Sequence, residues 1–119
     1  MAFKQPWPKA RARKLPGVMN KLEQRYAQYL DLQLKAGEIQ DWQYETITFK
    51  LGHDTRYTPD FPVIAKDNTL EFHETKGFKF AKNMQKLKIA ASMFRFKFIL
   101  VTEEKGQFIL TEIPGSGGR

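Results

Sequence analysis

Two carboxylates and a lysine interrupt the clearest strand pattern in the chain, a pair of apolar runs within residues 56–77. Asp60 follows a proline in the first run, and Glu74 and Lys76 lie in the second. Side chains alternate between faces along a strand, so Glu74 and Lys76 continue the apolar row that precedes them. We therefore expect both residues at the edge of a buried face, where an acid and a lysine are suited to chemistry on a phosphate.

Whether Asp60 shares that face depends on the turn between the two runs. A two-residue turn would place Asp60 opposite Thr75, on the other face of the hairpin. A three-residue loop at 66–68, or a bulge near Pro62, would place Asp60 opposite Glu74. In that second arrangement the two carboxylates lie within about 5 Å of each other, which is costly unless a cation sits between them.

Such a site would suit phosphodiester hydrolysis. Carboxylate oxygens prefer a hard divalent ion such as Mg²⁺, which polarises phosphate and lowers the pKa of bound water. A lysine beside it would orient that water or stabilise developing negative charge. The structural alternative is that Asp60 caps a turn, while Glu74 pairs with Lys76 or Lys97 on a solvated face.

The composition limits which kind of metal site and which class of partner can be expected. The chain has 119 residues, no cysteine and two histidines, so it forms no disulfide or thiolate zinc site. The absence of cysteine suits a reducing compartment, and we expect the cytoplasm. No apolar run approaches the roughly 20 residues that span a bilayer, so no membrane partner is expected. A net charge of +7 in one small domain indicates a polyanion as partner.

The expected elements define one domain. A helix begins at Asn20, its predicted N-cap, and stops at Gly37. A second helix is expected after the hairpin, so the strands on either side of it should run parallel within a mixed sheet. The fold class is therefore α/β or α+β, with a mixed central sheet of about five strands flanked by helices. The other predicted elements are strands at 39–51, 96–102 and 107–113 and the second helix within 78–94.

Basic residues are concentrated in two places. Between Glu74 and Glu103 the sequence has no acid, and three lysines there share one face of the predicted second helix: Lys79, Lys82 and Lys86. Like charges on one face repel each other, which favours an external anion over a merely solvated surface. Residues 1–17 are expected to form a flexible basic arm, either contacting phosphates or keeping the chain soluble. Its candidate phosphate-binding residues are Lys9, Arg11, Arg13 and Lys14, and a flexible tail is expected at 114–119.

The hairpin residues resemble a known nuclease motif. Pro59-Asp60, followed by Glu74-Thr75-Lys76 on the next strand, resembles the PD-(D/E)XK motif. The longer strings YTPDF and ETKG are similar to those of small phage nucleases and of phage junction-resolving endonucleases of the endonuclease I type. The resemblance covers roughly residues 20–100 and implies a restriction-endonuclease-like fold for a domain at 18–113. It also implies a homodimer, because the resolvases act as dimers.

Carried over residue by residue, the resemblance assigns roles to the motif. Asp60 and Glu74 would ligate Mg²⁺, for which Mn²⁺ would substitute, together with the backbone carbonyl of Thr75. Lys76 would be the catalytic lysine. Glu23 would match an acid that many members carry on the first helix, as a catalytic residue and further candidate ligand.

Glu23 also has a structural alternative. It shares a row with residues expected to face the core, which suits a carboxylate reaching inward to the metal. However, Asn20 and Glu23 also have the spacing of a capping box, in which Glu23 would bond back to the N-cap amide. The sequence does not decide between the metal-binding and the capping role of Glu23. Gln85 could match a polar residue that some members place on the second helix.

The expected function is a Mg²⁺-dependent endonuclease acting on phage or prophage DNA. The alternative enzyme is a Holliday-junction or flap resolvase. The interval from Asp60 to Glu74 is longer than in those resolvases and the chain stops sooner, so junction specificity does not follow. The alternative from another class is a non-catalytic DNA- or RNA-binding module, which would need the basic face but not Asp60 or Glu74.

Overall fold

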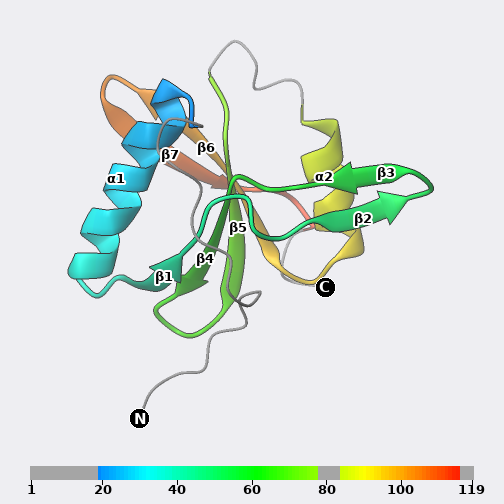
Figure 1. Ribbon diagram of the computed structural model, residues 1–119, viewed down its shortest axis with the longest axis horizontal. Helices are drawn as coiled ribbons and strands as arrows, with labels where there is room; N and C mark the ends of the chain where they lie inside the picture. The colour runs from blue at the N-terminus through cyan, green and yellow to red at the C-terminus, as the bar shows by residue number, and fades with distance from the viewer. Residues whose placement is uncertain (1–18, 78–83, 116–119) are drawn as a thin grey trace.

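The computed structural model describes residues 19–77 and 84–115, which form two helices and two sheets (Figure 1). The larger sheet has five strands in the order β1-β4-β5-β6-β7, and the smaller pairs β2 with β3. The helices are α1 (Lys21–Lys35) and α2 (Gln85–Met93). The strands are β1 (Ile39–Trp42), β2 (Phe49–Gly52), β3 (Thr55–Tyr57), β4 (Phe61–Ala65), β5 (Leu70–Thr75), β6 (Lys97–Glu104) and β7 (Gln107–Glu112).

The larger sheet is mixed, as expected. β5 and β6 run parallel and are joined through the segment that contains α2, whereas the other neighbouring pairs are antiparallel. The parallel pair follows from the helical crossover, because strands joined by a tight turn must be antiparallel. The predicted α+β domain with a mixed five-stranded sheet and flanking helices is confirmed, and it is compatible with a restriction-endonuclease-like fold.

The two faces of the sheet carry separate cores. On one face, α1 contributes Tyr26 and Leu30, which are buried with Phe61 of β4. On the other face, α2 and the β2–β3 hairpin bury Leu87 and Phe49 against aromatic side chains of β5 and β6. Figure 1 shows α1 on one side of β5, and α2 with β2 and β3 on the other. β5 is thus central, and its alternate residues face different helices.

The predicted strand at 39–51 is wrong as a single element. Its first part, β1, pairs with β4, whereas its last part belongs to β2, which pairs with β3. Between them Glu45 has a φ of 53°, in the left-handed region, so the chain turns out of the first sheet. Beyond residue 51, where no separate element is predicted before the motif hairpin, the chain closes the short β2–β3 hairpin, with a left-handed Asp54 at its turn.

The first helix agrees with its prediction. Asn20 is its N-cap, and Gly37 lies just past its end with a φ of 79°, a conformation that favours glycine. The second helix is observed over Gln85–Met93, inside its predicted range of 78–94, and residues 78–83 of that range lie outside the described residues. The predicted arm at 1–17 and most of the predicted tail also lie outside them. Neither described helix is long and apolar enough to cross a membrane.

Candidate active site

The hairpin that carries the motif has the register needed to bring its acids together. Phe61 pairs with His73 and Ile64 with Leu70, and the Ala65 amide donates to the Thr69 carbonyl at 2.8 Å. Residues 66–68 therefore form the three-residue loop that was one of the two predicted alternatives. Continued by one position, this register sets Asp60 across from Glu74 at the end of the β4–β5 ladder.

The Asp60 carboxylate occupies the end of that ladder. Its Oδ2 accepts hydrogen bonds from the Thr75 amide and the Thr75 hydroxyl, each at 2.9 Å. The Lys76 amide donates to Val101 of β6, so the Thr75 amide, one residue earlier, points the opposite way, toward Asp60. The carboxylate thus takes the position of a strand carbonyl, between the two faces of the sheet. It does not cap a turn, so that part of the structural alternative is wrong.

On the α1 side, Asp60 is joined by two further acids. One oxygen from each of Glu23, Glu45 and Asp60 lies within 4.8 Å of the others. Glu23 is 9% exposed and Asp60 is 7% exposed, so both carboxylates are withdrawn from solvent. We refer to Glu23, Glu45 and Asp60 as the carboxylate cluster.

Glu23 combines the two arrangements that the sequence left open. Its Oε1 accepts from the Asn20 amide at 3.0 Å, and the Asn20 side chain accepts from the Glu23 amide at 2.7 Å, which completes a capping box. The same Oε1 accepts from the Tyr44 hydroxyl at 2.8 Å. The capping box is therefore confirmed, and it holds the Glu23 carboxylate beside Asp60.

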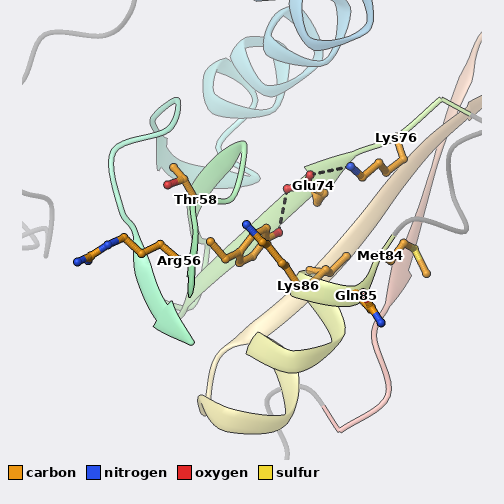
Figure 2. A pocket seen from close by; sticks show the side chains of 9 residues that line it. Arg56, Thr58, Glu74, Lys76, Met84, Gln85 and Lys86 are labelled. Atoms are coloured by element: carbon orange, nitrogen blue, oxygen red, sulfur yellow. Dashed lines mark hydrogen bonds and ion pairs between the residues drawn. The ribbon is translucent and has the colours of Figure 1, made fainter. Parts of the chain in front are cut away.

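On the α2 side, Glu74 lies next to Lys76. Glu74 Oε1 accepts from the Tyr57 hydroxyl at 2.8 Å, and Glu74 Oε2 lies 3.4 Å from Lys76 Nζ (Figure 2). The pairing of Glu74 with Lys76 named in the structural alternative is thus present. However, Glu74 is buried, and both residues line a pocket of about 390 Å³ with β3 and the start of α2.

The buried acids repel one another. Burial raises the pKa of Asp60 to about 8, and the charges of Glu74 and Glu23 add to the rise, while the hydrogen bonds from Thr75 oppose it. Burial also raises the pKa of Glu74, against the lowering effects of the Tyr57 hydroxyl and Lys76. The pKa of Tyr57 is raised by burial and by Glu74, so this phenol stays a neutral donor. A bound cation would relieve this repulsion.

The donors fit a hard cation such as Mg²⁺. Every side-chain ligand atom of the carboxylate cluster is an oxygen, the donor type that Mg²⁺ prefers. Glu74, predicted as a ligand, is outside this cluster, although its charge acts on Asp60. Thr75 contacts Asp60 through its amide and hydroxyl. The roles of the Glu74 carboxylate and the Thr75 carbonyl as ligands remain predictions.

Sequence reasoning missed Glu45. It lies inside the segment predicted as a continuous strand, where a charged residue in an alternating run indicates a solvent-facing position. The structure instead gives it a left-handed φ of 53° and directs its amide to the Asp60 carbonyl at 2.9 Å. That contact joins residues far apart in the sequence, so local patterns do not reveal it. The only sign of a site residue at this position was the acidic side chain itself.

One predicted phosphate-binding lysine can be placed. Lys86 is exposed in the first turn of α2 and lines the pocket beside Glu74 and Lys76. The other predicted phosphate-binding residues lie outside the described part of the chain: Lys9, Arg11, Arg13, Lys14, Lys79 and Lys82. Arg56 of β3, also on the pocket lining, was not singled out from the sequence.

No protein-family model, curated protein or solved structure matches this chain significantly. The nuclease resemblance therefore rests on the motif residues, and its physical support is the geometry around Asp60.

Proposed function

We propose that this protein is a metal-dependent DNA endonuclease that hydrolyses phosphodiester bonds. The observation that supports the proposal is the position of the Asp60 carboxylate. It lies at the end of the motif hairpin, next to Glu23 and Glu45, and its pKa is raised by burial and by the charge of Glu74. A site with buried acids and an adjacent lysine matches the needs of phosphodiester hydrolysis better than those of passive binding.

The carboxylate cluster would hold Mg²⁺, or Mn²⁺ in its place, with Glu74 close by. When bound, the ion would supply Lewis-acid polarisation of the phosphate and a lowered pKa of coordinated water. Asp60 is held in place by two hydrogen bonds from Thr75, and Glu23 by bonds from Asn20 and Tyr44. These contacts fix the direction of both carboxylates before any substrate arrives.

Lys76 would act on the substrate directly. Its side chain is 28% exposed, and its ammonium group lies 3.4 Å from Glu74 Oε2 at the wall of the pocket. Glu74 thereby holds the ammonium at the mouth of the site while leaving other N–H donors free to point outward. One of these donors would bind a phosphate oxygen or orient the attacking water.

The raised pKa of Asp60 would shape the pH dependence of cleavage. Below about pH 8 the metal-free carboxyl carries a proton much of the time. A cation needs the ionised form, so its binding would release that proton and become tighter as pH rises. Cleavage at a fixed, limiting Mg²⁺ concentration should therefore increase between pH 6 and pH 8.

The net charge of +7 favours a polyanion as the substrate. Together with the motif resemblance, it supports phage or prophage DNA in the cytoplasm as the substrate. Contacts would be made mainly to backbone phosphates, without reading bases. A homodimer would supply the two sites that cutting both strands requires.

A non-catalytic binding module explains the basic residues but not the acids. Buried carboxylates that raise one another's pKa destabilise the fold when they are ionised, and they repel DNA. A module that only binds would gain nothing from keeping Glu23, Asp60 and Glu74 together. The nuclease accounts for both features.

The proposal is tested by incubating the protein with supercoiled, linear and four-way-junction DNA, in Mg²⁺, in Mn²⁺ or in EDTA. We expect cleavage with either metal ion and none in EDTA. Lys76→Ala should lower the cleavage rate at least about 100-fold, because removing one proton-transfer or charge-stabilising group typically costs that much. Because Lys76 is already paired with Glu74, its loss should weaken duplex binding far less than it slows cleavage. Lys35→Ala is the matched control, since Lys35 is an exposed lysine in the last turn of α1.

Preference for the junction substrate would favour the resolvase form of the enzyme. Absence of cleavage of all three substrates in both Mg²⁺ and Mn²⁺, with DNA binding intact, would contradict the nuclease and favour the binding module.

A further inference from the structure

A pocket of about 390 Å³ lies beside Glu74 and Lys76. It lies between β3, the end of β5 and the first turn of α2 (Figure 2). Its polar lining comes from all three elements: Arg56, Thr58, Glu74, Lys76, Gln85 and Lys86. We call it the hairpin pocket. Its volume is at the low end of the range of ligand sites, sufficient for a small polar group.

The cations around the hairpin pocket outnumber its acid. Lys76 is paired with Glu74, but neither Arg56 nor Lys86 forms an ion pair with any carboxylate among residues 19–77 and 84–115. Arg25 shows the contrasting case, because its guanidinium donates three hydrogen bonds to the Glu103 carboxylate on β6. Cations left unpaired at a hollow favour an external anion.

The two free cations approach the pocket differently. Figure 2 shows Lys86 extending from the start of α2 toward the side of the pocket where Glu74 lies. Arg56 also belongs to the pocket lining, and its side chain extends outward from β3, away from Glu74. Thr58, whose hydroxyl is 2.7 Å from that of Thr48, adds a neutral hydrogen-bonding group to the same wall. The positive groups therefore run from the Glu74–Lys76 pair outward.

We propose that the hairpin pocket binds a phosphate group of the DNA strand next to the phosphate being cleaved, through Lys86 and Arg56 of its lining. This inference rests on the proposed function, which places the scissile phosphate at the carboxylate cluster and Lys76. A strand continuing from there passes the pocket, because Lys76 and Glu74, whose charge acts on Asp60, both line it. The site reads no base and sets the direction in which the strand leaves the metal centre.

The test is fluorescence anisotropy with a short labelled DNA duplex, measured in EDTA at several salt concentrations between roughly 50 and 200 mM. Lys86→Gln and Arg56→Gln should each raise the Kd about tenfold and reduce the slope of log K against log salt by about one, as expected for a lost phosphate contact. Both side chains are exposed, so circular dichroism should show unchanged folding in either variant.

Matched controls come from the same elements. Lys88→Gln removes an exposed lysine from α2. Lys50→Gln removes the exposed lysine that is the cross-strand neighbour of Arg56 in the β2–β3 hairpin. Neither residue lines the pocket. Both should change the Kd by less than about threefold. Equal weakening by all four variants, or no weakening by Lys86→Gln and Arg56→Gln, would overturn the proposal.

Binding in EDTA separates this inference from the catalytic one. A chain that never cleaves DNA but shows pocket-dependent binding would contradict the nuclease and keep the pocket. If the protein cleaves DNA and Lys76→Ala abolishes cleavage, while Lys86→Gln and Arg56→Gln leave the Kd unchanged, the pocket proposal is contradicted and the nuclease proposal stands.

Discussion

At Asp60, the demands of stability and of the proposed chemistry oppose each other. The side chain is 7% exposed and accepts two hydrogen bonds from Thr75, which favour its ionised form. Burial and the charges of Glu74 and Glu23 outweigh those bonds and raise the pKa to about 8. A residue kept for packing alone would be better served by a neutral amide.

Asp60→Asn should therefore stabilise the metal-free protein at pH 8 and abolish cleavage. The amide oxygen can still accept from Thr75, while the repelling charge is removed. We expect a higher Tm than that of the unmodified chain at pH 8, by roughly 4 °C for each kcal/mol gained in a domain of this size. The difference should shrink toward pH 5, where the Asp60 carboxyl is protonated. A Tm below that of the unmodified chain at pH 8 would contradict this view of Asp60.

At the scale of elements, the first turn of α1 caps the helix and also contributes the Glu23 carboxylate to the carboxylate cluster. Mutations can separate these two roles. Asn20→Ala removes the side chain that accepts from the Glu23 amide, so it should cost about 1 kcal/mol in the free energy of unfolding. Glu23→Gln retains an acceptor for the Asn20 amide but removes the charge. We expect thermal melts to show the loss of stability mainly in Asn20→Ala.

DNA-cleavage rates should show the reverse order, with activity lost in Glu23→Gln and retained in Asn20→Ala below its melting temperature. If Glu23→Gln cleaved DNA as fast as the unmodified chain, Glu23 would be a helix cap only.

The elements also show what the sequence could predict. Helix α1, the motif hairpin and the parallel crossover follow from periodicity, capping residues and turn residues, all of which are local signals. The choice between a two- and a three-residue loop was not local, because both are compatible with residues 66–68. The observed loop has a left-handed Asn68, φ 73°, and it sets Asp60 across from Glu74.

Two features of the fold depend on contacts between separate parts of the chain, which local sequence patterns do not reveal. The break between β1 and β2 is made where the Glu45 amide donates to the Asp60 carbonyl, and the alternation of side chains looks the same on both sides of it. Strand β3 has three residues and pairs with β2, and a run this short carries no alternating pattern that would predict a strand. The break between β1 and β2 sets the position of Glu45, and strand β3 forms one side of the hairpin pocket.

For the whole molecule, the raised pKa values make stability depend on pH. Asp60 and Glu74 bind protons more tightly in the folded than in the unfolded protein, where Asp60 would titrate near 3.8. The folded state therefore holds more protons, and the free energy of unfolding should fall as pH rises from about 4 to about 8. Denaturant unfolding of the protein in EDTA should show this decline, with a smaller slope for Asp60→Asn.

Mg²⁺ should offset the decline, since it binds the ionised carboxylates of the folded protein only. We expect the ion to raise the Tm more at pH 8 than at pH 5. An equal shift at both pH values would indicate that Mg²⁺ acts elsewhere on the protein.

The most direct test of the metal centre is calorimetric titration of Mg²⁺ into the purified chain at pH 7, in two buffers that differ in ionisation enthalpy. We predict saturable binding that releases about one proton per ion, because the raised pKa leaves Asp60 protonated before the ion binds. Both the binding and the proton release should be lost in Asp60→Asn. The absence of saturable binding to the unmodified chain, or equal binding by the variant, would contradict a cation site at the carboxylate cluster.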